Sequence, residues 1–151
     1  MGLEIADGEV QKLLCGLLGR EVAVSPVDTV EPHSATARGL VTEEDELVAV
    51  IASDLFFAHS SGAALAMIPA HTLDGKENDP DEELMEVYQE VANVVSRVVN
   101  EASPKRLRLD PNMDHPVDTL EAIVVEGNVL SSVSTDIEGY GIGKLGVWYL
   151  D

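Results

Sequence analysis

The sequence predicts an α+β fold of two layers, in which helices pack on one face of an antiparallel sheet. Three observations predict this fold: a helical segment near the start, a long amphipathic helix in the middle, and strand-like runs joined by short turns. The order of helix, strands, helix, then helix and strands suggests two similar halves. The chain has 151 residues, of which 45% are hydrophobic and 25% charged, so we expect residues 1–151 to form one globular domain.

The first half combines two helical segments with three strand-like runs. Residues 8–18 carry apolar side chains at helical spacing, and Gly19 follows as a C-cap. Ser53 or Asp54 can cap a second helix that extends to about Met67. A short acidic turn joins the last two strand-like runs into a β-hairpin. The three runs are residues 21–24, 35–41 and 46–52.

The second half opens with the helix that the sequence predicts most strongly. Asp79 is expected as its N-cap, with Pro80 at the first helical position and Glu82 completing a capping box. The helix should run to about Ala102, and its apolar residues cover about half of the circumference, which predicts deep packing. Four strand-like runs follow, with loops and turns between them. They are residues 107–109, 120–125, 129–134 and 143–150.

The charge of the chain excludes several classes of partner. Nine Lys and Arg residues oppose 28 Asp and Glu residues, which gives a formal net charge of −19. Such a surface repels phosphate backbones and anionic lipids, so we expect neither nucleic acid nor a membrane as partner. The acidity fits either a saline host or simple solubility. No basic targeting segment or long apolar stretch is present, which predicts a cytoplasmic protein, and the single Cys15 forms no intrachain disulfide.

Several familiar motifs lack the structural context that their chemistry needs. Residues 141–146 match G-x-G-x-x-G, but no helix can follow them to receive a pyrophosphate, so these glycines are expected in a closely packed strand. The four histidines are scattered, and none has metal-ligand spacing to another His or Cys. The sequence therefore predicts no metal site, no nucleotide cofactor and no hydrolytic triad.

The polar face of the long helix is the remaining candidate site. Glu86, Glu90, Asn93 and Arg97 recur at helical spacing and form a single line on one face. One interpretation is the ordinary solvent face of an amphipathic helix, on which Glu83, Glu86 and Glu90 are hydrated while Glu90, Asn93 and Arg97 exchange local contacts. Asn93 favours a second interpretation, because asparagine is a poor residue for the middle of a helix and its presence needs a reason.

These residues resemble the motif of the CheC/CheX/FliY family of chemotaxis phosphatases. That motif is an Asp or Ser, three residues, Glu, two residues, Asn, and a Pro about twenty-two residues later. Here Glu90 and Asn93 match, Pro116 follows at that interval, and Glu86 stands at the Asp or Ser position. The first helix has Lys12 where a second motif would need Asn, so the single-site CheX type is the closer likeness.

The resemblance implies an activity, a partner and roles for the motif residues. The activity is hydrolysis of the aspartyl phosphate on a CheY-like receiver domain, whose own Mg²⁺ holds the phosphoryl group, so no metal or cofactor of this chain is required. Asn93 would orient the attacking water and Glu90 would dock the receiver. Glu86, Arg97 and Pro116 would contact the partner. The family also implies a homodimer that shares sheet edges.

Two alternatives stay open at this point. The presence of Glu86 at the Asp or Ser position motivates the first alternative, a catalytically silent, CheX-like adaptor. Such an adaptor binds a receiver or a flagellar-switch protein without catalysing any reaction on it. The other alternative is an unrelated α+β domain with a coincidental motif, in which Glu90 and Asn93 would be buried or would point away from any open helix face.

Overall fold

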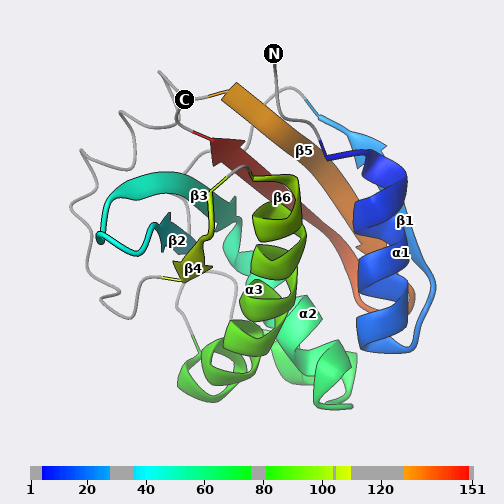
Figure 1. Cartoon of the computed structure of the whole chain (residues 1–151). Helices are drawn as coiled ribbons and strands as arrows, with labels where there is room; N and C mark the ends of the chain where they lie inside the picture. Colours follow the sequence, from blue (N-terminus) through cyan, green and yellow to red (C-terminus); the bar gives the residue numbers. More distant parts are fainter. Residues whose placement is uncertain (1–4, 28–35, 76–80, 104, 110–127, 150–151) are drawn as a thin grey trace.

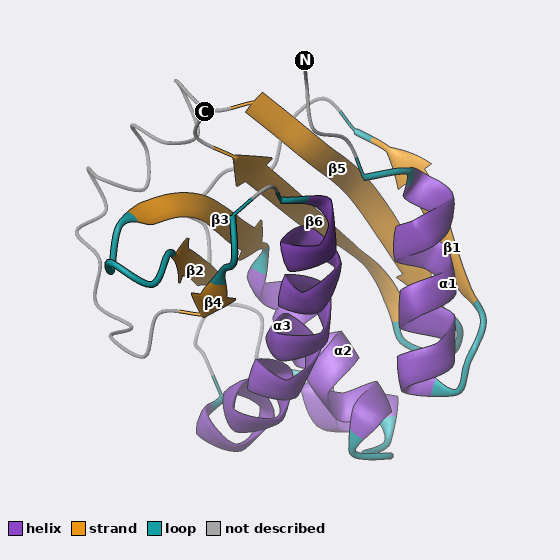
Figure 2. Cartoon of the chain, in the orientation of Figure 1, coloured by secondary structure: helices purple, strands orange, loops and turns teal. Residues whose placement is uncertain are grey.

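Three helices cover one face of a six-stranded antiparallel sheet in the computed structural model of the chain (Figures 1 and 2). The structure describes residues 5–27, 36–75, 81–103, 105–109 and 128–149. The elements are α1 (Asp7–Leu18), β1 (Val22–Pro26), β2 (Thr36–Val41), β3 (Leu47–Ser53), α2 (Leu55–Leu65), the 3₁₀ helix η1 (Ala70–Leu73), α3 (Glu82–Ala102), β4 (Arg108–Leu109), β5 (Asn128–Ile137) and β6 (Gly141–Tyr149). The two-layer α+β prediction is confirmed.

The sheet order shows that the two halves of the chain are related. The strands lie in the order β1-β5-β6-β3-β2-β4, and every neighbouring pair is antiparallel. If β1 is exchanged with β4, β2 with β5 and β3 with β6, the result is the same strand order read from the opposite edge of the sheet. Helix α1 precedes β1 as α3 precedes β4. The predicted pair of similar halves is therefore present, with α1 and α3 as equivalent helices.

Helix α3 begins two residues later than the capping residues predicted. The N-cap is Asp81, whose carboxylate accepts a hydrogen bond from the Leu84 amide at 3.0 Å. The Asp81 amide in turn donates to Nε2 of His59 at 3.0 Å, which ties the start of α3 to α2. The prediction of Asp79 as N-cap is wrong, because this tertiary contact selects the second of two suitable aspartates; Asp79 itself lies outside the described residues. The predicted end at Ala102 is confirmed.

Helix α2 is buried on almost every side, although its sequence contains two serines and a glycine. Asp54 caps it by accepting from the Phe57 amide at 2.8 Å, as one of the two predicted caps. The hydroxyls of Ser60 and Ser61 donate to carbonyls one turn earlier, so both are satisfied while buried. A Cβ on Gly62 would lie 2.7 Å from the Leu84 carbonyl oxygen of α3. The small residues therefore allow α2 and α3 to pack closely.

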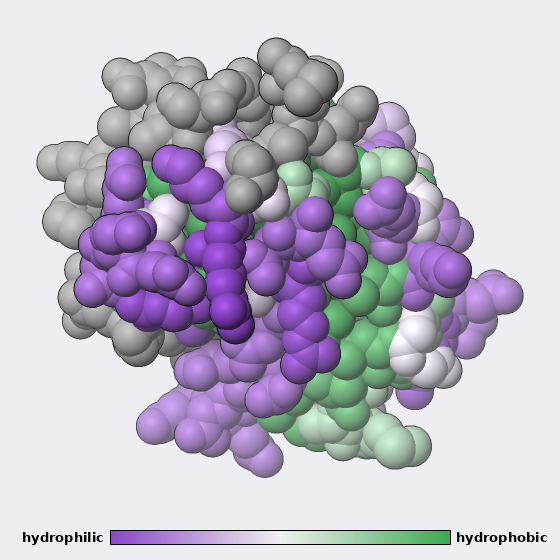
Figure 3. All heavy atoms as spheres, in the orientation of Figure 1, coloured by the Kyte–Doolittle hydropathy of each residue, from purple (hydrophilic) through white to green (hydrophobic). Residues whose placement is uncertain are grey.

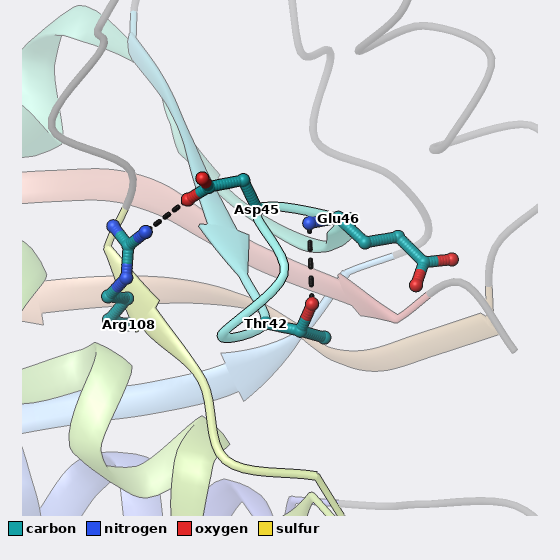
Figure 4. A network of polar contacts seen from close by, with 4 residues as sticks. All are labelled: Thr42, Asp45, Glu46 and Arg108. Carbon is teal, nitrogen blue, oxygen red and sulfur yellow. Dashed lines mark hydrogen bonds and ion pairs between the residues drawn. The ribbon is translucent and has the colours of Figure 1, made fainter.

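The predicted hairpin and the later strands are largely confirmed. β2 and β3 pair across the acidic turn, and β5 and β6 pair across a second turn. Figure 4 shows that Arg108 of β4 forms an ion pair with Asp45 in the first turn, beside the hydrogen bond from the Glu46 amide to the Thr42 hydroxyl. Both charged side chains of the pair are exposed, so its contribution to stability is small. The expected strand at residues 120–125 lies outside the described residues.

Candidate functional site

The deeply packed α3 presents one polar face to solvent. Its opposite face fills the core with Leu84, Tyr88, Val91, Ala92, Val95 and Val99. Glu86, Glu90 and Arg97 are exposed on the polar face, and Asn93 is half-buried. All four predicted residues of this helix therefore share one face, while Pro116 lies outside the described residues.

The segment between Glu90 and Asn93 holds these two side chains in place. Val91 is 0% exposed and Ala92 is 1% exposed, so the helix cannot rotate about its axis without opening the core. Residues three apart on a helix lie one above the other, so the carboxylate and the carboxamide project from neighbouring turns. The packing of α3 thus fixes the relative position of the two functional groups.

The side chains of Glu90 and Asn93 are not engaged within the part of the chain that the structure describes. Asn93 contributes only its backbone carbonyl, which accepts the Ser96 hydroxyl at 2.6 Å. No hydrogen bond or ion pair of the described residues involves the Glu90 carboxylate, the Asn93 carboxamide or the Arg97 guanidinium. The local contacts among Glu90, Asn93 and Arg97 that belong to the solvent-face interpretation are therefore not found among the described residues. The two groups also lie on an open helix face, unlike the expectation for a coincidental motif.

A second asparagine on α3 behaves differently. The side-chain oxygen of Asn100 accepts a hydrogen bond from the Leu107 amide at 2.7 Å and fixes the chain that leads into β4. Asn100 therefore has a structural role that explains its place near the end of the helix. Asn93 has no corresponding contact among the described residues, which leaves its carboxamide available to a partner.

The equivalent position on α1 carries different chemistry. The exchange of halves makes α1 the equivalent of α3, and on α1 the exposed Glu9 and Lys12 have the same spacing as Glu90 and Asn93. Lysine is a point charge with donors only, whereas a carboxamide both donates and accepts. Helix α1 therefore presents a charged face that lacks the functional group of α3.

The glycine motif and the possible metal ligands do not form functional sites among the described residues. Residues 141–146 lie in β6, where a Cβ on Gly143 would lie 2.6 Å from Cβ of Phe57 and one on Gly146 would lie 2.4 Å from the Trp148 ring. These glycines serve close packing, as predicted. Among the described residues, no group of three or more His, Cys, Asp and Glu side chains could hold a metal ion. The helices of those residues are all too short or too polar to cross a bilayer.

Comparison with known proteins identifies the fold. No protein-family model and no curated protein matches the sequence of this chain. Among solved structures, the middle domain of FliM from Vibrio alginolyticus is similar with a TM-score of 0.61 and 15% identity, over 95% of this chain and 88% of that one. CheX from Borrelia burgdorferi, solved in complex with CheY, BeF₃ and Mg²⁺, is similar with a TM-score of 0.52 and 14% identity, over 93% and 92% of the two chains.

The chain has a CheC/CheX/FliY-like fold. The resemblance inferred from the sequence is confirmed at the level of the fold. In this CheX-like fold, the helix that carries the Glu90 and Asn93 pair is buried on one face, mainly against α2, and open on the other.

The sequence did not reveal one feature beside this pair. A groove of about 580 Å³ lies between α1 and α3, and half-buried apolar side chains form its floor. The residues that line it are Glu9, Lys12, Leu13, Gly16, Leu17, Val94, Arg97 and Val98. Periodicity assigned the valines to the apolar half of α3, but it could not show that α1 stops short of covering them.

Proposed function

We propose that this protein is a phosphatase that hydrolyses the aspartyl phosphate of a CheY-like receiver domain. The observation that carries the proposal is the pairing of Glu90 and Asn93. They stand one turn apart on the open face of a helix whose other face is fixed in the core, with both side-chain groups unengaged within the described residues. The CheX-like fold and the family motif support the same activity.

The chemistry needs little from the phosphatase beyond positioning. An aspartyl phosphate is an activated acyl phosphate, and the receiver's own Mg²⁺ neutralises its charge. What remains is to place a water in line with the phosphorus atom. The Asn93 carboxamide has an acceptor for a proton of that water and donors for a phosphoryl oxygen. The water oxygen bonds to phosphorus as the bond to the aspartyl oxygen breaks, which yields inorganic phosphate and the free carboxylate.

Glu90 would set the register of docking. Its exposed carboxylate stands one turn before Asn93 and can pair with the lysine that receiver domains carry beside the phosphorylation site. Glu86 and Arg97 extend the same line by one turn in each direction and would contact the receiver surface. Pro116, outside the described residues, completes the set of proposed partner contacts.

The test is the decay of a radiolabelled phosphoryl group on a panel of CheY-like receivers, with and without this protein. Faster decay that the Asn93→Ala variant loses would support both the activity and the role of the residue. Unchanged decay across a panel that contains the host's own receivers would refute the phosphatase proposal.

A binding adaptor is the second candidate function, and one position favours it. The side chain at the Asp or Ser position of the motif is the exposed Glu86, whose carboxylate is one methylene group further from the helix than that of the Asp that the motif allows. An adaptor would bind a receiver without shortening the lifetime of its phosphoryl group. Binding measured together with phosphate release separates the two functions.

A further inference from the structure

An apolar groove between α1 and α3 borders the candidate site. Figure 3 shows an apolar strip between the places that α3 and α1 occupy in Figure 1. Leu13 and Leu17 of α1 and Val94 and Val98 of α3 are all half-buried. Such a strip with a polar rim is typical of a surface that a partner covers.

The groove is continuous with the candidate site. Val94 follows Asn93 directly and stands one turn after Glu90, and Arg97 belongs both to the polar line and to the groove lining. A partner that contacts Glu90 and Asn93 with an interface of ordinary size, about 800 Å² on each side, extends well beyond two side chains. The apolar groove borders them and can supply the desolvated centre of that interface.

The charges on the rim indicate what kind of partner fits. Lys12 and Arg97 are exposed, and neither forms an ion pair within the described residues. Glu9 is the one acidic side chain in the groove lining, so this lining has a net positive charge within a chain of net charge −19, and it creates a local attraction for an anionic partner. A receiver that carries an acyl phosphate is such a partner.

We infer that the α1–α3 groove is the apolar part of the docking surface for the phosphorylated receiver, with Lys12 and Arg97 facing acidic groups of that partner. The inference rests on the proposed function. It gives α1, which lacks the asparagine of a second motif, a role in binding. Gly16 lies in the groove wall with no atom within 4 Å of where its Cβ would be, so an apolar helix or loop can approach α1 closely there.

The test fills the groove without disturbing the core. Leucine in Gly16→Leu would occupy the groove, and the matched control Gly8→Leu places the same side chain on an exposed part of α1 outside it. Both changes replace a helical glycine by a better helix former, so both variants should fold. The probe is a CheY-like receiver loaded with BeF₃⁻ and Mg²⁺, and the readout is its Kd.

We expect Gly16→Leu to raise the Kd at least tenfold and Gly8→Leu to leave it unchanged. Lys12→Glu should also raise the Kd, whereas Lys144→Glu, an equal charge change on β6, should not. Wild-type Kd values for Gly16→Leu and Lys12→Glu would overturn the inference while leaving an Asn93-dependent phosphatase intact. A solution dimer that Gly16→Leu dissociates would overturn it in favour of a second copy in the groove.

The experiments distinguish a failure of the groove inference from a failure of the proposed phosphatase function. If the wild-type protein neither binds any receiver of the panel nor accelerates its dephosphorylation, both proposals fail. If Asn93→Ala binds the loaded receiver like wild type but no longer accelerates decay, the proposed function holds and the groove variants alone decide the further inference.

Discussion

The two asparagines of α3 serve different ends. Asn100 is a structural residue, because its side-chain oxygen is the hydrogen-bond acceptor of the Leu107 amide. Asn93 carries a carboxamide with no such contact among the described residues, in a helical position where alanine would be the more stable choice. A residue that costs helix stability without an internal contact is typical of a functional site.

The variants Asn93→Ala and Asn100→Ala should therefore separate activity from stability. Asn93→Ala should lower the rate of phosphate release about 10²-fold, the order found when a positioning group is removed, with an equal or slightly higher melting temperature. Asn100→Ala should lower the free energy of unfolding by about 1–3 kcal/mol, because a buried amide loses its acceptor, and should keep the rate. Phosphate release and thermal unfolding measured on both variants check this, and an active Asn93→Ala protein would contradict the assignment.

Glu90 should act on affinity rather than on rate. Glu90→Ala should raise the Kd for the loaded receiver about tenfold, which corresponds to about 1.4 kcal/mol, while the rate at saturating receiver changes little. Glu101→Ala removes the same charge from an exposed position of α3 about three turns later and serves as the control. An equal effect of the two variants would show that only net charge matters.

At the scale of the elements, the sequence predicts what depends on local pattern and misses what depends on tertiary contact. The spacing of apolar residues was sufficient for α1, for the end of α3 and for the β2–β3 hairpin. The start of α3 was misplaced because His59 of α2 binds the Asp81 amide, a contact between residues far apart in the chain. The motif residues of the site were found from their spacing, whereas the groove beside them depends on how far apart α1 and α3 pack.

The glycines of α1 and α2 should respond oppositely to alanine. Gly62→Ala would place a Cβ 2.7 Å from the Leu84 carbonyl oxygen and force α2 and α3 apart, at a cost of about 1–3 kcal/mol in the free energy of unfolding. Gly16→Ala meets no atom within 4 Å and should increase that free energy by about 0.5–1 kcal/mol. Denaturant unfolding of both variants measures the difference, and a neutral Gly62→Ala would contradict the close packing.

At the scale of the whole molecule, the two halves share one strand order, but their equivalent helices α1 and α3 carry different side chains. Helix α3 keeps the carboxylate and the carboxamide, and α1 has a lysine at the motif position of the carboxamide. Because the chain has a net charge of −19 and only nine Lys and Arg residues, each cation changes the local electrostatic potential against an acidic background. Lys12 and Arg97 stand on the two helices that flank the groove.

The same charge should make stability depend on salt. Repulsion among like charges is stronger in the compact folded state than in the expanded chain, and screening shortens its range from about 30 Å at 0.01 M salt to about 8 Å at 0.15 M. We expect the melting temperature to rise over this interval of salt concentration. The rise should be equal in NaCl and KCl, because screening does not distinguish the two cations. Sedimentation over the same salt series also tests the expected homodimer, because charge repulsion opposes the association of two copies most strongly at low salt. A melting temperature that is independent of salt would show that self-repulsion does not limit this fold.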